Sequence, residues 1–401
     1  MMLAKEPDSL GRSGVGGGAA PPWSTRLVAI SGRPWNAMGG AERSLARLCR
    51  ALAERCDVDV IAPVGPEPDA RSPAAARLHV HQADPACAED LARALHALST
   101  GGPPPRWVYL SDKTLFKAPA LLALVRQLLP SARVLFKEST EGKLLRVLAA
   151  LTPGDRAECE AAIDRVVCIS SRIRRVFEQS GLWRGRLVDI PNGVDTQIFF
   201  PATAAEKTAL RTRLSLSPAG PVVIFAGRFA EKKNLDVVYG AWHELEGRRI
   251  HCGQLVLVGA AHKRYDEGIL RLMRQDLRSV RIVGPFRHDA EIVPWYRAAD
   301  VFLAPTSREG LSNAFLEACA CGLYPVVSRA SGYEDVITDA GFGRLVEERN
   351  TSDVIHALEA ICSESPDQRA ETCVRLRARI VERYDLAHVA AAYLRLFEDL
   401  R

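Results

Sequence analysis

The segment 301–322 reads VFLAPTSREGLSNAFLEACACG and predicts a strand, a short polar loop and a helix that begins near Ser312. At a helix N-terminus, the backbone N–H groups lack intrahelical partners and carry partial positive charge, so they suit a phosphate. Glu309, just before the helix, and Glu317, two turns inside it, can each contact hydroxyl groups on either side of that phosphate. The alternative is a buried βα unit in which neither glutamate contacts a ligand.

Short apolar runs alternate with helical segments along the rest of the chain. The strand-like runs cover residues 26–31, 58–61, 107–110, 133–136 and 166–169 in the first half, and 222–227, 255–259, 280–284, 301–304 and 324–327 in the second. Nearly continuous apolar strands between helices are typical of parallel sheets covered on both faces. The pattern predicts an α/β fold of two doubly wound, Rossmann-like domains that face each other and bind a ligand at the carboxyl ends of their strands.

The length of 401 residues exceeds one ordinary core and favours two domains. We expect a disordered Gly/Ala/Pro-rich tail at 1–23, an N-terminal, acceptor-side domain at 24–197 and a C-terminal, ligand-binding domain at 198–383. The break lies in segment 195–220, which is rich in Pro, Ala and Ser. The last segment, 384–401, predicts a helix with Val389, Tyr393, Leu396 and Phe397 on one face, which we expect to cross back and pack on the N-terminal domain.

Bulk properties narrow the class of protein. The chain is 47% hydrophobic and 25% charged, and its net charge of +5 is too mild and dispersed to favour nucleic acid as a partner. None of its ten cysteines forms a Cys-x-x-Cys pair, a pattern that suits reduced thiols rather than a disulfide framework or a zinc site. No stretch of about 18 apolar residues is present, so the sequence predicts a cytoplasmic protein without a membrane span.

A basic loop follows the first strand of the second half. Residues 225–234 read FAGRFAEKKN, and the turn at Gly227 is followed at once by Arg228 and then by Lys233. Across one loop, the planar guanidinium and the ammonium can converge on a single diphosphate. A solvated basic loop is the alternative, but doubly wound folds bind phosphate at this position.

These features resemble the ordered landmarks of the family 4 retaining glycosyltransferases, and the resemblance covers roughly residues 25–400. The matching motifs are Gly39-Gly40-Ala41-Glu42, Ile190-Pro191-Asn192-Gly193-Val194-Asp195 with Phe199 and Pro201, Gly227-Arg228 with Lys233, Tyr296-Arg297-Ala298-Ala299-Asp300, and Glu309-x7-Glu317. Each motif is weak alone, but five motifs in the correct order and spacing are specific.

The resemblance implies a GT-B-type fold and transfer of a sugar, with retained anomeric configuration, from a nucleotide diphosphate sugar to a glycan or lipid-linked oligosaccharide. A UDP-sugar is the expected donor, and neither a metal nor another cofactor is implied. Two alternatives stay open: a small-molecule natural product as acceptor, or a nucleotide-sugar-binding module without turnover. The sequence does not indicate the oligomeric state.

Carried over residue by residue, the resemblance assigns catalytic roles to Arg228, Lys233 and Glu309. Arg228 and Lys233 would bind the diphosphate, Glu309 the donor sugar and Glu317 the ribose, while the base would lie near the loop 284–286. The complete implied donor-binding set is Gly39, Gly40, Arg228, Lys233, Pro285, Phe286, Glu309, Gly310, Leu311, Ser312, Asn313 and Glu317.

Three further stretches each have a functional and a structural interpretation. The family often carries a histidine after the strand 133–136, where this chain has Lys137-Glu138, so these two residues are weak substitutes and a salt-bridged loop is the favoured interpretation. Asp57-Val58-Asp59 matches a metal motif of another glycosyltransferase fold, but strand alternation explains it. Segment 143–151 is a candidate for peripheral contact with the cytoplasmic membrane face, although helix packing explains the same residues and is favoured.

Overall fold

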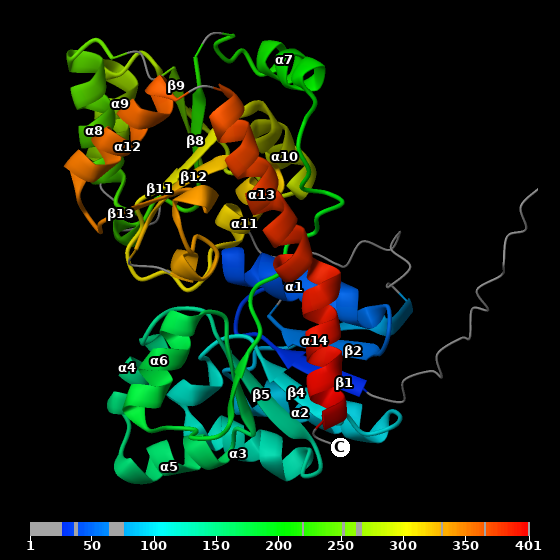
Figure 1. Cartoon of the computed structure of the whole chain (residues 1–401). Coiled ribbons are helices and arrows are strands. Elements are labelled where there is room, and N and C mark those ends of the chain that lie inside the picture. The colour runs from blue at the N-terminus through cyan, green and yellow to red at the C-terminus, as the bar shows by residue number, and fades with distance from the viewer. Residues whose placement is uncertain are drawn as a thin grey trace, which may run out of the picture.

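The computed structural model describes residues 26–35, 39–63, 76–218, 220–250, 253–261, 267–329, 332–364 and 366–399. The predicted tail at 1–23 lies outside these residues. The described chain forms two lobes, stacked one above the other in Figure 1, and each lobe is built on its own parallel sheet.

The first lobe, which is lowermost in Figure 1, uses the N-terminal half of the chain. Its elements are β1 (Arg26–Ile30), α1 (Gly40–Ala53), β2 (Asp57–Ala62), β3 (Leu78–Gln82), α2 (Ala88–Thr100), β4 (Trp107–Leu110), η2 (Leu115–Lys117), α3 (Pro119–Leu128), β5 (Arg133–Glu138), α4 (Lys143–Ala149), α5 (Pro153–Ala161), β6 (Arg165–Cys168), α6 (Ser171–Ser180) and β7 (Leu187–Asp189).

The second lobe follows, and the last helix leaves it again. The elements are α7 (Ala204–Arg213), β8 (Val222–Ala226), η3 (Glu231–Lys233), α8 (Leu235–Gly247), β9 (Gln254–Val258), α9 (Glu267–Asp276), β10 (Val280–Val283), α10 (Asp289–Ala298), β11 (Val301–Ala304), α11 (Asn313–Ala320), β12 (Tyr324–Ser328), η4 (Gly332–Asp335), η5 (Ala340–Phe342), β13 (Arg344–Val346), α12 (Thr351–Ser363), α13 (Pro366–Tyr384) and α14 (Leu386–Asp399).

Both sheets are doubly wound, which confirms the predicted fold class. Among the described residues, the strand order is β3-β2-β1-β4-β5-β6-β7 in the first sheet and β10-β9-β8-β11-β12-β13 in the second. All neighbouring strands are parallel. The strand order reverses between β1 and β4 and between β8 and β11, so the loops after these strands diverge and leave room for a ligand.

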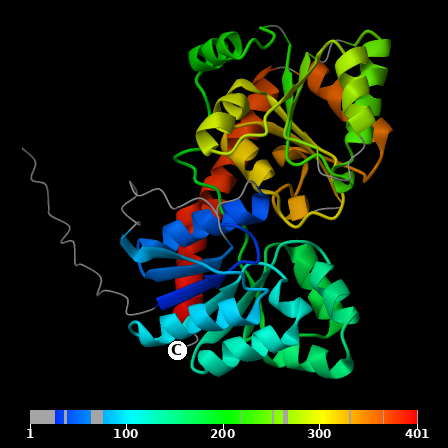
Figure 2. The same cartoon turned by 180° about the vertical axis from the view of Figure 1, so that it is seen from behind.

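The period-two alternation of the strands explains how helices cover both faces of the first sheet. Leu27 and Ala29 of β1 pack with α1 and α14, whereas Val28 and Ile30 pack with α2 and α3. Figures 1 and 2 show these two layers from opposite sides, with α14 in red on one face and α2 and α3 in cyan on the other.

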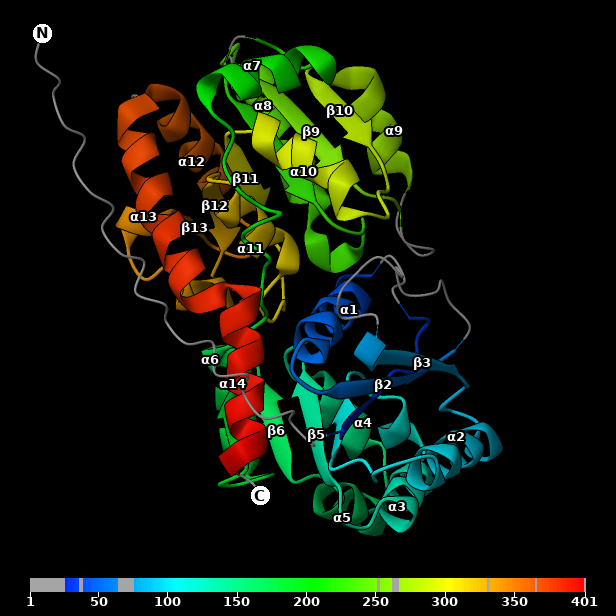
Figure 3. The ribbon, with the colours of Figure 1, turned by 90° about the vertical axis from the view of Figure 1, so that its right-hand side faces the viewer.

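The C-terminal helix crosses from the second lobe to the first, as the sequence predicts. In Figure 3, α13 runs along the second lobe and α14 continues down the side of the first. The Phe397 ring stacks on Trp107 of β4 with centroids 4.7 Å apart, and Tyr393 meets Tyr109 edge-on at 5.8 Å. The apolar face read from the sequence is therefore the face that packs on the first sheet.

The crossing point between α13 and α14 is anchored by the chain that links the lobes. The backbone N–H of Val194 donates to the Tyr384 carbonyl at 2.8 Å, and that of Leu386 donates to the Val194 carbonyl at 2.9 Å. A Cβ at Gly193 would lie 3.0 Å from the Leu386 Cα, a tight contact that glycine relieves. The Asn192-Gly193 turn of the sequence thus has a packing role.

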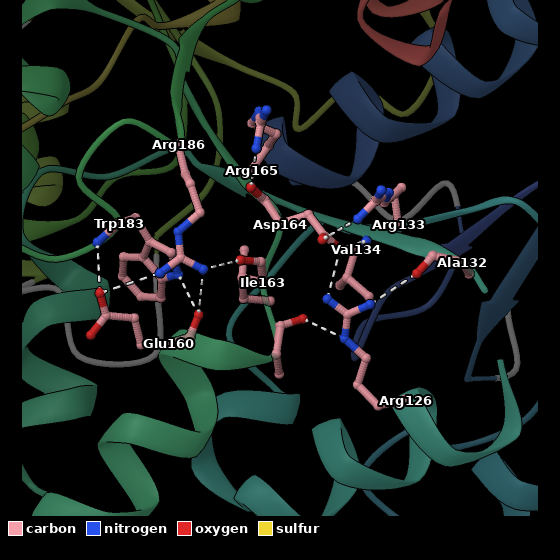
Figure 4. Close-up of polar contacts among 11 residues, drawn as sticks. Arg126, Ala132, Arg133, Val134, Glu160, Ile163, Asp164, Arg165, Trp183 and Arg186 are labelled. Carbon is pink, nitrogen blue, oxygen red and sulfur yellow. Dashed lines mark hydrogen bonds and ion pairs between the residues drawn. The ribbon is translucent and has the colours of Figure 1, made fainter. Parts of the chain in front are cut away.

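Polar side chains form a hydrogen-bond network at the amino-terminal ends of the strands of the first sheet (Figure 4). Arg126 of α3 donates to the carbonyls of Ala162 and Ala132 and to the Asp164 carboxylate at 2.7 Å. Burial alone would raise the pKa of Asp164, but the Val134 N–H and Arg126 outweigh it, and the pKa is lowered. This network satisfies strand and helix ends and points to a structural role.

Three edge strands lie outside the ten runs given above: β3, where His79 and His81 alternate in a strand-like stretch, and the short strands β7 and β13, which the sequence does not indicate. The strands β7 and β13 each contain three residues, too few to show a period of two, and sheet pairing alone reveals them. The proposed domain boundaries stay a prediction, but α7 lies with the second sheet because Lys207 and Arg211 both pair with Asp300.

Replacing Phe397 with alanine should lower the free energy of unfolding by about 3–5 kcal/mol, because it empties a buried aromatic site between α14 and the first sheet. Urea unfolding measures the effect. Val374→Ala on α13 is the matched control, since Val374 is 69% exposed and its truncation should change little. Equal effects from the two variants would contradict the assigned docking of α14.

Candidate functional site

The loops after β8 and β11 lie side by side at the point where the second strand order reverses. Asn234, at the end of the loop after β8, is buried and donates to the Pro305 carbonyl at 2.7 Å and to Ser307 Oγ at 2.8 Å. The Ser307 N–H donates back to the Lys232 carbonyl at 2.8 Å. These bonds hold the basic loop against the loop that carries Glu309.

Glu309 and two lysines form the centre of this arrangement. The Glu309 carboxylate lies 2.7 Å from Lys232 Nζ and 3.0 Å from Lys233 Nζ. Burial alone would raise the pKa of Glu309, but the charges of Lys233 and Lys232 outweigh it and lower the pKa to about 2. Burial also lowers the pKa of Lys233. Two cations and one anion at a switch point leave a local excess of positive charge.

Arg228 is exposed at the start of the same loop, and its charge adds to the burial that lowers the pKa of Lys233, whose side chain is 11% exposed. The Lys233 side chain packs on Gly227, since a Cβ at Gly227 would lie 3.7 Å from its Nζ. The structure therefore places Arg228 close enough to Lys233 for their charges to interact, as the spacing in the sequence predicts.

The start of α11 meets the first lobe at close range. The Asn313 side-chain amide donates to the Gly40 carbonyl of α1 at 2.7 Å, so the predicted glycine loop lies against this helix N-terminus. A Cβ at Gly310 would lie 2.7 Å from the Ser139 carbonyl oxygen. Leu311 is buried, and its carbonyl accepts from the Asn192 side chain at 2.7 Å. Ser312 is the N-cap residue, and its side chain makes no capping bond.

Gly39 lies against an ion pair of the first lobe whose carboxylate is buried and whose guanidinium is partly exposed. Glu42 lies beneath Gly39, where an added Cβ would approach Glu42 Oε2 to 1.8 Å, and it pairs with Arg33 at 2.5 Å. An added Cβ at position 39 would meet only the flexible end of the Glu42 side chain, so this contact alone does not require glycine.

Glu317 is fully buried and faces the other lobe. Its carboxylate accepts from Arg47 of α1 at 2.7 Å and from the Tyr296 hydroxyl at 3.2 Å. Arg47 also pairs with Asp289 at 2.6 Å and lies 5.1 Å from the centroid of the Phe199 ring. Burial opposes the charge of Arg47, but Glu317 and Asp289 outweigh it and raise the pKa of Arg47.

The loop predicted to hold the base lies next to Asp289. Pro285 is exposed, and the Phe286 ring stacks on Trp295 of α10 with centroids 6.0 Å apart. The Arg281 guanidinium lies 5.3 Å from the centroid of the same Trp295 ring. A planar group could reach this loop from solvent, but its assigned role stays a prediction.

Lys137 and Glu138, which replace the family histidine, point in different directions from β5. Lys137 is buried and donates to Ser44 Oγ of α1 at 3.1 Å, and burial lowers its pKa to about 8. Glu138 is buried, pairs with Lys113 at 2.5 Å and accepts the backbone N–H of Leu144 at 3.0 Å. The glutamate therefore belongs to the salt-bridged loop that the sequence favours.

The stretches set aside in the sequence have structural partners. Asp59 pairs with Arg26 at 2.6 Å and with His81 at 2.7 Å, and no metal-binding cluster of His, Cys, Asp and Glu occurs among the described residues. Leu144 and Leu148 of α4 are buried in the core, which is the packing interpretation of segment 143–151. No helix in the described ranges has the length and apolar character needed to cross a bilayer.

A cavity of about 330 Å³ lies elsewhere, at the amino ends of β4 and β5. It is lined by Arg106, Trp107, Arg126, Pro130, Ser131, Ala132 and Arg133. Doubly wound sheets bind ligands at the opposite edge, so this cavity is not part of the candidate site.

Four residues of the site escaped the sequence prediction: Ser44, Arg47, Asn192 and Asp289. Asn192 was quoted as part of a motif of the family resemblance but was given no role in the site. Arg47 lies on the buried face of α1, between Ala46 and Leu48, where an apolar residue would be expected. A buried arginine at such a position is a usable signal, because guanidinium groups are buried only with partners.

Comparisons with known proteins agree with this picture. Residues 220–364 match the family Glycosyl transferases group 1, which confirms the predicted family resemblance. The chain is 30% identical over 277 residues to D-inositol 3-phosphate glycosyltransferase 2 of Catenulispora acidiphila, covering 63% of each chain. It is 27% identical over 241 residues to the GDP-mannose-dependent monoacylated alpha-(1-6)-phosphatidylinositol monomannoside mannosyltransferase of Corynebacterium glutamicum, covering 58% of this chain and 62% of that protein. The chain thus spans just under two thirds of the length of these relatives.

Solved structures share the whole architecture. Anabaena Alr3699/HepE in complex with UDP and glucose aligns with a TM-score of 0.73 and 16% identity, over 94% of this chain and 100% of that one. WaaG, a glycosyltransferase involved in lipopolysaccharide biosynthesis, aligns with a TM-score of 0.68 and 16% identity, over 92% and 99% of the two chains. At these identities, the likeness establishes the GT-B-type fold and leaves activity open.

Replacing Arg47 with methionine should destabilise the protein by about 3–5 kcal/mol, because it leaves the buried carboxylate of Glu317 without its cation. Urea unfolding measures the loss. Arg55→Met, at an exposed position just after α1, is the control and should change stability little. If Arg47→Met were as stable as the control, the interlobe ion pair would not be formed in solution.

Glu309 should contribute a pH-dependent stability. Its pKa is lowered from 4.5 to about 2 by folding, so its contribution is complete above pH 4.5 and is lost as pH falls toward 2. The unfolding free energy of wild type should therefore exceed that of Glu309→Gln at pH 6, and the difference should shrink between pH 4.5 and 2. Urea titrations across this range test the expectation, and a difference independent of pH would contradict it.

Proposed function

We propose that this chain is a retaining glycosyltransferase that moves a sugar from a nucleotide diphosphate sugar to a glycan or lipid-linked acceptor. The observation that carries the proposal is the grouping of Lys232, Lys233 and Glu309 beside the N-terminus of α11, at the switch point of the second sheet. The relatives add support, since they include a GDP-mannose-dependent mannosyltransferase, and one structural neighbour holds UDP and glucose.

The diphosphate of the donor is assigned to Arg228, Lys233 and the backbone N–H groups at the start of α11. Before the donor arrives, Glu309 neutralises part of the charge on the two lysines. A bound diphosphate brings its own negative charge, so Lys233 can turn to it and leave the Glu309 carboxylate to accept hydrogen bonds from the sugar hydroxyls. Because Glu309 and the lysines are adjacent, the diphosphate and the sugar can be bound within one site.

The difficult event in the reaction is departure of the diphosphate from the anomeric carbon. As that bond breaks, negative charge grows on the leaving phosphate oxygen, where fixed cations and oriented N–H groups stabilise it. The acceptor hydroxyl attacks from the same face and passes its proton to that oxygen. One C–O bond breaks, one C–O bond forms on the same face, and the configuration is retained without a covalent enzyme intermediate.

The ribose is assigned to Glu317, and this assignment requires a movement. Glu317 is fully buried against Arg47 of α1, so a ribose can contact it only after α1 withdraws from α11. Donor binding therefore calls for a more open arrangement of the two lobes than the one described, followed by closure over the nucleotide.

We place the reaction in the cytoplasm. Among the described residues, Cys49, Cys56, Cys159 and Cys168 are free, buried thiols, as expected in a reducing compartment. The cysteines, and not the residues of the site, indicate this compartment.

Replacing Arg228 with alanine should lower turnover by a factor on the order of 10², the usual cost of removing one stabiliser of a developing charge. Release of nucleoside diphosphate from the donor is the measurement. Arg271→Ala, an exposed arginine of α9, is the matched control and should retain wild-type turnover. Near-normal turnover in Arg228→Ala would rule out the assigned role.

Thermal unfolding with UDP, GDP and ADP should identify the base, with UDP the expected ligand. A nucleotide present at 100 times its dissociation constant stabilises the folded state by about 2.7 kcal/mol, which is readily measured. Stabilisation by none of the three would argue against nucleotide binding. Stabilisation without sugar transfer or hydrolysis would instead leave a nucleotide-sugar-binding module.

A further inference from the structure

Three neighbouring strands of the first sheet each place a cation at their carboxyl ends, facing the second lobe. Arg33 follows β1, Lys113 follows β4, and Lys143 begins α4 after β5. The strand order β1-β4-β5 makes these three loops adjacent. None of these residues belongs to the donor site assigned above.

Two acidic side chains, the half-buried Asp112 and the buried Glu138, connect the three loops. Asp112 accepts the backbone N–H of Gly32 at 2.8 Å and that of Thr114 at 2.8 Å, which joins the loops after β1 and β4. A Cβ at Gly32 would overlap the Thr114 side chain, so the two loops are in direct contact. The cations after these strands are therefore held at fixed separations.

Glu138 joins the second and third loops. One of its oxygens pairs with Lys113 at 2.5 Å and also accepts the N–H groups of Ser139 and Thr140, both at 2.9 Å. The other oxygen accepts the Leu144 N–H at 3.0 Å, in the first turn of α4. Lys143 is consequently positioned by the same carboxylate that pairs with Lys113.

On this surface Arg33 and Lys232 are more exposed than the carboxylates with which they pair. The Arg33 side chain is 44% exposed while its partner Glu42 is 5% exposed. Across the gap, Lys232 is 39% exposed while Glu309 is 13% exposed. Glu138 is buried below Lys143. An incoming ligand therefore meets cationic groups first.

Lys143 is the exposed cation of this group that has no carboxylate at ion-pair distance within the described part of the chain. Its environment is unfavourable to its charge: burial lowers its pKa, and the charges of Lys113, Arg33 and Lys232 lower it further against the single opposing effect of Glu138. An ammonium group among three other cations is stabilised by an anion that bridges them.

We propose that the loops after β1, β4 and β5 bind a phosphate group of the acceptor, through Arg33 and Lys143 in the first lobe with Lys232 facing them from the second. This inference rests on the proposed glycosyl transfer and specifies its acceptor as a phosphorylated molecule. Lys113 is buried and supplies charge from beneath. The donor diphosphate has separate partners in Arg228 and Lys233, so the two anions are bound side by side without sharing a cation pair.

The phosphate can come from a soluble sugar or polyol phosphate or from a lipid headgroup. Both sources present the same chemistry to Arg33 and Lys143. The expected affinity difference between phosphorylated and unphosphorylated forms of one probe is about tenfold or more, which corresponds to one or two charge-assisted hydrogen bonds.

The test is calorimetric titration of the full chain with its donor site saturated by UDP. One soluble probe is inorganic phosphate. The others are glucose 6-phosphate, compared with glucose, and myo-inositol 1-phosphate, compared with myo-inositol. A second arm measures sedimentation with vesicles of phosphatidylcholine, with and without phosphatidylinositol. The proteins are wild type, Lys143→Ala, Lys143→Arg and, as a matched control, Lys117→Ala at an exposed lysine of η2.

We expect wild type and Lys117→Ala to bind the phosphate-bearing probes of one arm about tenfold or more tightly than their uncharged partners. Lys143→Ala should lose that preference, and Lys143→Arg should restore most of it. The proposal is overturned if no phosphate-bearing probe is preferred in either arm, or if Lys143→Ala binds like wild type. Release of UDP from UDP-sugar by wild type is scored separately, so a failure of glycosyl transfer is distinguished from a failure of phosphate recognition.

Discussion

The ion pairs of Glu309 with Lys232 and Lys233 are the constraint on which the account of the site depends. They join the loop after β8 to the loop after β11, at the place where the strand order reverses and the two loops would otherwise diverge. One carboxylate between two ammonium groups also leaves unbalanced positive charge beside the start of α11. The same contact therefore holds the site in shape before a ligand arrives and prepares it for an anion.

The two lobes are held together by polar contacts that a nucleotide must rearrange. Arg47 of α1 reaches Glu317, and the amides of Asn192 and Asn313 bond to backbone carbonyls across the gap. Breaking a buried ion pair is costly, whereas each neutral hydrogen bond contributes only about 1 kcal/mol. The arrangement described is accordingly a closed one, and ligand entry is coupled to movement of α1 against α11.

The sequence predicted the parts of this protein that depend on local pattern. The strands β4 and β11 were located at the residue and α14 within the segment 384–401, because apolar runs and period 3.6 are local properties. Glu309, Lys233 and Gly40 were found through spacing and the family resemblance. Arg47 and Asp289 were not, since their pairing joins positions 242 residues apart and leaves no local trace. The edge strands β7 and β13 were missed for a similar reason, because pairing rather than composition defines them.

The central claim is that a nucleoside diphosphate lies between the loop after β8 and the N-terminus of α11. A crystal structure of the protein with UDP tests it most directly. We predict that the phosphates lie within hydrogen-bond distance of Arg228, Lys233 and the backbone N–H groups at the start of α11, with α1 displaced from Glu317. A nucleotide bound instead in the arginine-lined cavity at the amino ends of β4 and β5, with Lys232 and Lys233 still paired only with Glu309, would contradict the account.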